Sequence, residues 1–204
     1  MQPPVSARRI TVAPERLGRW LDGFAHRHGG VERTESSDVV TLVGADGDRA
    51  WIVVPFPPLT GALTEHALRA RRIGVLLVRR SGYAVGVFEG TRLVASKVDS
   101  TYVQGTTKAG GWSQQRFARR RANQAEAAFA AAADVAARLL SSAPLDAFVA
   151  GGDRAAVRAI LADRRLARAA ELLTGPWLEV KDPKRRVLEQ MPEQFRAVRI
   201  HLDP

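Results

Sequence analysis

The chain has 204 residues, which is long enough for one good-sized domain, or for a domain with a smaller appendage. Because 46% of the residues are hydrophobic, we expect a packed core. Its formal net charge of +10 favours a polyanionic partner such as nucleic acid. Cysteine is absent from the sequence, which excludes disulfides, thiolate zinc sites and cysteine nucleophiles.

No apolar run in the sequence reaches transmembrane length. Even the alanine-rich stretch 127–140 contains Asp134 and Arg138. The first residues also lack the apolar run of a signal peptide. We therefore expect a soluble cytoplasmic protein that has no membrane partner.

The first third of the chain predicts a strand, a helix and a hairpin. The helix begins at Pro14, because proline is favoured at the first helical position, and it ends before Gly29. Prolines at 55, 57 and 58 break regular structure, so we divide the chain into a small α/β segment, 1–66, packed on a main domain, 67–204. The expected elements are a strand at 8–12, a helix from 14 to about 28, and strands at 39–43 and 50–55.

The main domain predicts a meander followed by alternating strands and helices. Three strand-like runs at 73–80, 83–89 and 92–99 are separated by short turns, which is typical of an antiparallel meander. Together with flanking helices, they predict an α/β fold with a mixed sheet. The other expected elements are a short helix within 60–71, a loop at 100–112, a long helix at about 113–140, a strand at 145–150, a helix at 154–173 and strands at 177–181 and 196–202.

The most informative segment runs from Lys108 to Arg121. Gly110 and Gly111 lack a Cβ and so permit backbone conformations that other residues forbid. They lead to Gln114, which opens the long helix, and Ser113 is a natural N-cap. The segment therefore presents a neutral amide on a glycine-bearing loop.

Arginine dominates the first turns of that helix, with Arg116, Arg119, Arg120 and Arg121. Positive charge is unfavourable at a helix N-terminus unless an anion offsets it, because the helix dipole is already positive there. Guanidinium groups and Lys108 suit phosphate, although a solvated charged face is the alternative. An apolar stripe is expected farther along, at Phe117, Ala128, Ala132, Val135 and Leu139.

The run Gly110-Gly-Trp-Ser-Gln114, followed by an arginine-rich helix, resembles the catalytic loop of the Vms-type, release-factor-like peptidyl-tRNA hydrolases. That family is related to the middle domain of the eukaryotic class-one release factor, and this chain resembles a bacterial, actinobacterial relative of it. The family's Gly-x-x-Gln signature matches Gly111 to Gln114. The resemblance covers about residues 67–204 and implies a ribonuclease H-like fold for them.

By the resemblance, Gln114 is the catalytic glutamine, and Gly110 and Gly111 are the hinge that lets it enter the peptidyl-transferase centre. The implied activity is hydrolysis of peptidyl-tRNA on stalled or split large ribosomal subunits. The partners would be peptidyl-tRNA and the ribosomal RNA of the large subunit. We expect no cofactor, no metal and a monomeric protein. The RNA-binding residues would be Lys108, Ser113, Arg116, Arg119, Arg120 and Arg121.

This sequence departs from the eukaryotic release factors, in which the glutamine directly follows two glycines, because Trp112 and Ser113 intervene here. Gln115 stands beside Gln114 and is a second candidate for the catalytic amide. Two alternatives to ester hydrolysis stay open. One is endonucleolytic cutting near the tRNA acceptor end, and the other is a non-catalytic module that binds RNA or the ribosome.

Three further features are assigned other roles. His26 and His28 with Asp22 resemble a metal site, but cations at a helix C-terminus are the preferred interpretation. The Gly151-Gly-Asp153 run is expected to be a strand-to-helix turn. The basic stretch 181–186 is expected to be a surface loop that offers a second contact to RNA.

Overall fold

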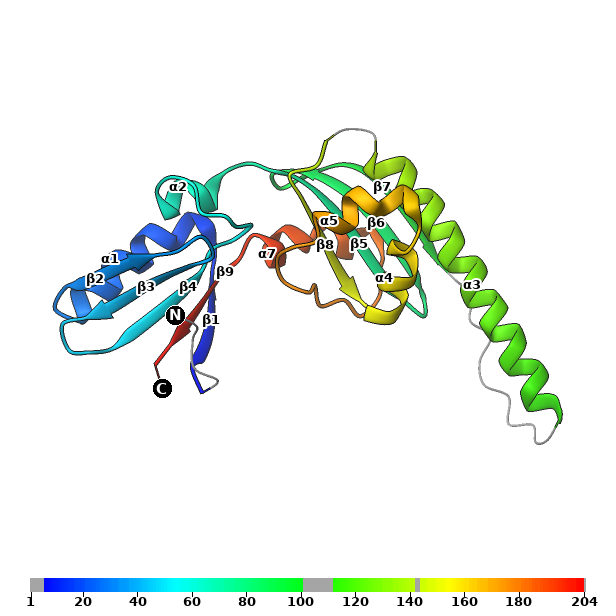
Figure 1. Cartoon of the computed structure of the whole chain (residues 1–204), viewed down its shortest axis with the longest axis horizontal. Helices are drawn as coiled ribbons and strands as arrows, with labels where there is room; N and C mark the ends of the chain where they lie inside the picture. Colours follow the sequence, from blue (N-terminus) through cyan, green and yellow to red (C-terminus); the bar gives the residue numbers. More distant parts are fainter. Residues whose placement is uncertain (1–5, 101–111, 142–143, 204) are drawn as a thin grey trace. The chain divides into compact units, whose positions relative to one another are not determined.

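The computed structural model describes residues 6–100, 112–141 and 144–203, and within the long helix it describes side chains from residue 126 onward. The chain divides into two units. The first unit comprises Met1–Arg69 and Pro192–Pro204, and the second comprises Ala70–Met191. Figure 1 labels the helices and strands, and its colours follow the sequence from the N-terminus to the C-terminus.

A five-stranded sheet forms the framework of the first unit, and all neighbouring strands in it are antiparallel. Four of its strands lie where the sequence predicts them or within two residues of that place. The unpredicted strand is β2, whose mostly exposed residues include Glu32, Arg33 and Glu35, a polar composition that is common at a sheet edge. The spatial order is β1 (Arg8–Val12), β9 (Val198–Leu202), β4 (Arg49–Val53), β3 (Val39–Gly44) and β2 (Val31–Glu35).

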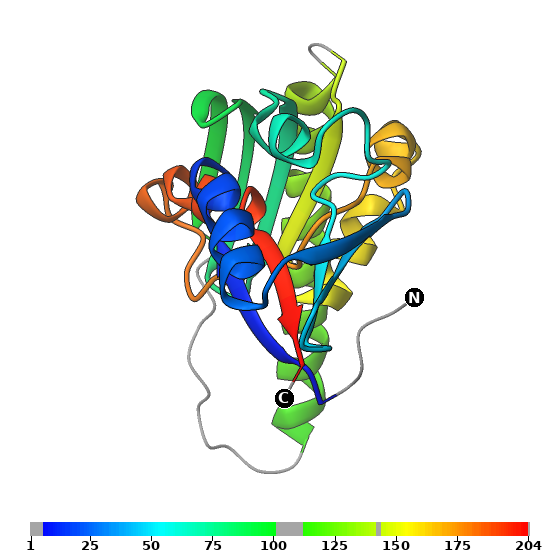
Figure 2. The same cartoon turned by 90° about the vertical axis from the view of Figure 1, so that its left-hand side faces the viewer.

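Helices cover one face of this sheet. A short 3-10 helix, η1 (Pro14–Arg16), leads into α1 (Leu17–Arg27), and α2 (Leu63–Leu68) follows the last hairpin strand. The predicted helical start at Pro14 is confirmed. Leu17 and Phe24 of α1 are buried in the core of the unit, together with strand residues such as Ile200. Figure 2 shows α1, in blue, lying against the sheet beside β1 and β9.

The predicted strand at 196–202 forms, but it belongs to the first unit. β9 pairs with β1 and with β4, and its Val198 and Ile200 are fully buried in the first unit's core. The predicted segment 67–204 includes this strand, whereas its strand pairing lies within the first unit. The local sequence of a strand specifies a pattern of burial, whereas the partner strands are chosen by long-range pairing.

The second unit contains a four-stranded mixed sheet. Its spatial order is β7 (Arg92–Ser100), β6 (Gly82–Glu89), β5 (Arg72–Arg79) and β8 (Ala147–Gly152). The first three strands form the predicted antiparallel meander, and β8 pairs with β5 in parallel. The predicted α/β class with a mixed sheet is thereby confirmed. A parallel neighbour requires a crossover, which the long helix α3 (Trp112–Leu140) supplies.

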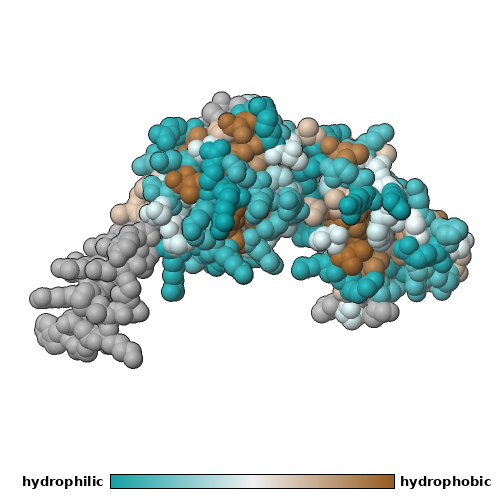
Figure 3. Space-filling model, turned by 180° about the vertical axis from the view of Figure 1, so that it is seen from behind, coloured by the Kyte–Doolittle hydropathy of each residue, from teal (hydrophilic) through white to brown (hydrophobic). Residues whose placement is uncertain are grey.

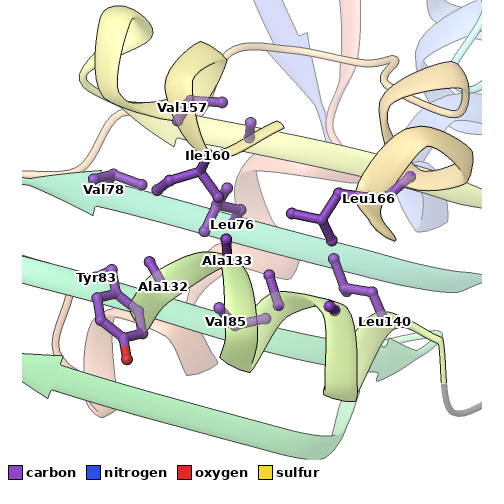
Figure 4. Packing of buried hydrophobic residues seen from close by; sticks show 14 of the residues in the cluster. Leu76, Val78, Tyr83, Val85, Ala132, Ala133, Leu140, Val157, Ile160 and Leu166 are labelled. Carbon is purple, nitrogen blue, oxygen red and sulfur yellow. The ribbon is translucent and has the colours of Figure 1, made fainter. Parts of the chain in front are cut away.

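The second half of α3 packs on this sheet. Figure 4 shows Ala132, Ala133 and Leu140 in one cluster with residues of β5 and β6 such as Leu76 and Val85. The predicted stripe is partly wrong, because Val135 and Leu139 are only partly buried. The fully or nearly fully buried positions of the described part of α3 are Ala132, Ala133, Ala136, Ala137 and Leu140.

Alanines face the sheet because their small side chains let the helix backbone approach it closely. Gly74 of β5 adds to this fit. A Cβ at Gly74 would lie 2.8 Å from a methyl group of Leu140 and 2.8 Å from one of Leu145. Large apolar residues dominate the periodicity that is read from a sequence, so the prediction placed the stripe one position away from its true centre.

The single helix predicted at 154–173 is wrong, since the chain forms α4 (Arg154–Leu161), η2 (Arg164–Leu166) and α5 (Ala167–Glu171) there. The break falls at Asp163, whose carboxylate accepts a hydrogen bond from the backbone N–H of Arg165 and so starts a new turn.

The strand predicted at 177–181 is reduced to one isolated bridge between Leu178 and Gly151. This segment begins after Pro176, which cannot donate a backbone hydrogen bond. Farther along the chain, α6 (Arg185–Glu189) and α7 (Met191–Phe195) complete the elements.

The visible surface in Figure 3 is mainly hydrophilic, with smaller hydrophobic patches between the polar residues. Among the described residues, Leu68 and Leu173 are the large hydrophobic side chains with substantial exposure. None of the helices in the described ranges combines the length and apolar character that crossing a membrane would need.

Candidate functional site

The ends of four strands of the second unit lie together at one end of its sheet, which we call the basic edge. In the register of the sheet, Arg79 of β5 lies opposite Gly82 of β6, and Gly82 lies opposite Ser100 of β7. On the other side, Val78 of β5 lies beside Gly152 of β8. Residues 101–111 follow directly after Ser100, so the predicted catalytic segment leaves the sheet from this edge.

Basic side chains gather at this edge. Arg79 and Arg80 are exposed in the turn from β5 to β6, and Arg79 donates a hydrogen bond of 2.6 Å from Nε to the carbonyl of Val180. That bond draws the basic stretch that starts at Lys181 to the same edge. Exposed arginine and lysine here form a surface that suits phosphate.

Asp182 fixes this stretch from the other side. Its carboxylate accepts a hydrogen bond of 3.1 Å from Ser81 Oγ and lies 2.9 Å from Lys184 Nζ. These contacts, led by that with Lys184, lower the pKa of Asp182. The predicted surface loop at 181–186 therefore has an anchored first half, and from Arg185 onward it becomes α6.

The turn from β8 to α4 completes the edge. Asp153 caps α4 by accepting hydrogen bonds from the backbone N–H groups of Ala155 and Ala156, at 2.9 and 3.1 Å. Gly152 has φ of 87°, and a Cβ there would collide with the carbonyl oxygen of Val78. Since Asp153 occupies the helix N-terminus, the predicted strand-to-helix turn is confirmed.

Arg154 and Trp177 form a cation–π pair beside this turn. The guanidinium carbon of Arg154 lies 4.3 Å from the centre of the Trp177 ring. The indole Nε1 in turn donates a hydrogen bond of 3.0 Å to the carbonyl of Gly152. This pair presents an exposed cation and a fixed aromatic ring at the same edge as Arg79 and Arg80.

The predicted site residues lie in and after the segment that leaves this edge. Lys108, Gly110 and Gly111 lie outside the described residues. Ser113, Gln114, Arg116, Arg119, Arg120 and Arg121 lie in the first turns of α3, for which the structure describes the helix and not the side chains. The helix begins at Trp112, one residue before its predicted start, so Ser113 and Gln114 belong to its first turn. Figure 1 shows these first turns extending beyond the sheet.

Sequence reasoning did not assign Arg79, Arg80, Arg154 or Trp177 to a site. The first two were visible as a basic pair before a turn, but a basic turn alone is a common surface feature. Arg154 and Trp177 are 23 positions apart in the sequence, so their pairing has no local signal. The sheet register brings these residues to one edge.

His28 does pair with acidic groups, but not with Asp22. Its Nδ1 lies 2.8 Å from an oxygen of Asp46 and 3.5 Å from one of Asp48, both in the turn between β3 and β4. The hydrogen bond with His28 lowers the pKa of Asp46. These three ligand-type groups lie within 4.8 Å of one another, and they connect the end of α1 to the hairpin turn.

The sequence matches a family model described as "Actinobacteria/chloroflexi VLRF1 release factor" over residues 71–201, almost two thirds of the chain. Among curated proteins, none matches the chain significantly.

Two solved structures are similar at low identity. One, titled "Archaeal protein", is 16% identical, with a TM-score of 0.40, and covers 89% of this chain and 57% of its own. The other is the crystal structure of the archaeal translation termination factor aRF1, which is 12% identical, with a TM-score of 0.35, and covers 84% of this chain and 59% of its own. This chain thus spans less than two thirds of either structure.

The family match confirms the resemblance that the glycine–glutamine segment indicates. The match includes the whole basic edge, the segment 101–111 and α3. On this basis, the chain belongs to the actinobacterial and chloroflexi VLRF1 release-factor family.

Proposed function

We propose that this protein is a peptidyl-tRNA hydrolase that frees nascent chains from stalled or split large ribosomal subunits, and that Gln114 orients the hydrolytic water. The observation that carries the proposal is the position of the glycine–glutamine segment. It follows Ser100 at the basic edge of the second unit and opens an arginine-rich helix. Membership in a release-factor family supports the choice of reaction.

The chemistry requires little of the protein. The ester of a peptidyl-tRNA is already activated, so its hydrolysis mainly needs one water held in line with the carbonyl carbon. The water oxygen forms the new bond to that carbon, the bond to the ribose oxygen breaks, and a proton from the water passes to that oxygen to give the free ribose hydroxyl. A glutamine amide can donate to and accept from the water, although it is no general base. Gly110 and Gly111 would give the segment the freedom to reach the ester.

The basic residues have a positioning role in this proposal. Lys108, Arg116, Arg119, Arg120 and Arg121 would contact phosphates of ribosomal RNA or of the tRNA acceptor stem, and Ser113 would lie among them at the start of α3. The exposed Arg79, Arg80 and Arg154 lie at the edge from which the segment departs. Such contacts hold RNA in register without reading its sequence.

The direct test uses purified large subunits that carry labelled peptidyl-tRNA. Wild-type protein should release the peptide and leave the tRNA with an intact CCA end, whereas Gln114→Ala should bind the subunits normally and release no peptide. Gln115→Ala is the matched control and should retain release. If Gln115→Ala loses release and Gln114→Ala keeps it, the catalytic amide is Gln115.

The same experiment separates the alternatives. Loss of the CCA end would assign nuclease chemistry in place of ester hydrolysis. Binding without release by any variant would leave a non-catalytic ribosome-binding module. Charge reversal of Arg119 and Arg120 to Glu should weaken binding of the subunit in a strongly salt-dependent manner, because released counterions drive such binding.

A further inference from the structure

The sheet of the first unit has a second face, opposite the one that α1 covers. Successive side chains of a strand alternate between the two faces, and residues directly opposite each other on neighbouring strands share a face. Ile10, Ile200 and Ile52 form one such row, and it lies in the core beneath α1. The next row, Arg9, His201 and Trp51, therefore lies on the other face, which we call the open face.

The centre of the open face is positively charged. Thr11 and Arg199 are opposite each other two positions along from Arg9 and His201, so Arg199 joins the same face. The proximity of these cations has a measurable consequence. Burial lowers the pKa of Arg199 most, and the charge of Arg9 lowers it further. The pKa of His201 is likewise lowered by burial and by the charges of Arg9 and Arg199.

No carboxylate offsets these effects within the described part of the chain, since only burial and other cations shift the two groups. The carboxylates nearest in register lie in the neighbouring row of the same face. Glu32 shares a row with Val43 and Arg49, and the backbone N–H of Asp203 bonds to the carbonyl of Arg49 at 3.1 Å. That row also contains Arg49, whereas the charges that act on Arg199 and His201 are those of other arginines.

Trp51 contributes an unpaired donor to the same place. Its side chain is 3% exposed, and its indole Nε1 has no hydrogen-bond partner among the described residues. An unsatisfied buried N–H is unfavourable, so proteins seldom retain one without a reason. The open face therefore combines uncompensated cations with a free neutral donor, and an oxyanion ligand would satisfy both.

We propose that the open face, centred on Arg9, Arg199, His201 and Trp51, is an RNA-binding surface that contacts phosphates. The ligand class follows from the donors, because guanidinium groups and an N–H donor recognise phosphate oxygens. RNA carries a phosphate at every nucleotide, so one strand crossing the sheet would meet several of these groups. The ribosome association of the family makes ribosomal RNA the polyanion at hand. This surface is separate in sequence from the segment that carries Gln114.

The test measures the binding of a fluorescein-labelled oligouridine to the full-length protein by anisotropy over a series of KCl concentrations. Arg9→Gln with Arg199→Gln should weaken binding about 10-fold and reduce the slope of log affinity against log salt by about 1.4, or about 0.7 for each lost contact to a single strand. The matched control is Arg19→Gln with Arg27→Gln, which removes the same charge from exposed positions of α1, on the covered side of the sheet. It should bind within about twofold of wild type.

Arg199 is half-buried, so Arg9→Gln alone, at an exposed strand position, provides a variant that keeps the fold and should lose about threefold. Equal losses in the two double variants would overturn the proposal, because they would show an effect of net charge alone. Binding of the wild-type protein to immobilised polyglutamate, without binding of oligouridine, would overturn the proposal in favour of an acidic protein partner. Peptide release by Gln114→Ala is a separate measurement, so either proposal can fail alone.

Discussion

The two sheets of this protein expose different parts of themselves. In the second unit, β5 and β6 are buried along nearly their whole length, and the accessible charged groups gather where the strands end. In the first unit, only one face is covered by α1, and Arg9, Thr11 and Arg49 are exposed on strands. A sheet buried on both faces can offer a ligand only its edge and loops, whereas a sheet covered on one face can offer a surface.

This difference places the two proposals of RNA contact on different structural supports. The proposed catalytic segment follows directly after β7 in the sequence, at the rigid ends of the strands of the second sheet. The open face of the first unit is held by hydrogen bonds between strands, so its cations keep a fixed spacing. Rigid support favours positioning, and a connecting segment favours reach.

The largest effect is expected from a large-to-small substitution in the buried sheet, compared with one on the open face. Phe148→Ala, at a fully buried position of β8, should lower the free energy of unfolding by about 3–5 kcal/mol. Val43→Ala, at a half-buried position on the open face, should cost about 1 kcal/mol or less. Urea denaturation followed by circular dichroism measures both. Equal costs would show that the open face is covered as tightly as the second sheet.

The packing of α3 on the second sheet is tested by adding volume. Ala136→Leu should reduce the free energy of unfolding by about 1–3 kcal/mol, because Ala136 is fully buried against the sheet. Ala131→Leu places the same side chain at an exposed position of the same helix and should change it by less than about 0.5 kcal/mol. The reverse ranking in thermal unfolding would place the buried stripe on the opposite side of α3.

A smaller effect is expected at the cap of α4. Asp153→Ala removes the acceptor for the N–H groups of Ala155 and Ala156 and should cost about 1 kcal/mol of unfolding free energy. Asp153→Asn keeps an acceptor and should recover most of the loss. Hydrogen exchange at these two amides reports the cap directly. Unchanged exchange in the alanine variant would mean that the cap does not form in solution.

The smallest effect concerns the break between α4 and α5. Hydrogen bonds from Arg165 lower the pKa of Asp163 to about 2. Because the folded-state pKa lies below the ordinary value of 3.8, the stabilising contribution is complete above pH 3.8 and is lost as the pH falls towards 2. An NMR titration of the carboxyl carbon should give a midpoint near 2 in wild type and a higher one in Arg165→Gln. A wild-type midpoint near 3.8 would contradict the ion pair.

The sequence predicted the elements of the molecule better than their partners. The meander, the long helix and most strands of the first unit formed close to their expected places, because alternation and turn residues are local signals. β2 was missed because an edge strand of Glu and Arg residues has no apolar alternation. The break at Asp163 was missed because its cap competes with a helical pattern that continues through the neighbouring alanines.

The candidate site divides in the same way. The glycine–glutamine segment and its arginines are contiguous in the sequence, so they and the family they resemble were visible without a structure. The basic edge was not, since Arg79, Arg154 and Trp177 come from separate segments that meet only through the register of β5 with β8 and the path of the chain after α5.

By itself, the sequence determined the chemistry of this protein: its excess of arginine, its lack of thiols, and a glutamine placed between glycines and a basic helix. These are covalent facts, and no folding can change them. The tertiary structure decided which residues act together, since β9 returns from the end of the chain to place Arg199 and His201 beside Arg9 and Trp51. Such pairings depend on the burial of Val198 and Ile200 in a core made of distant segments, for which the sequence carries no local mark.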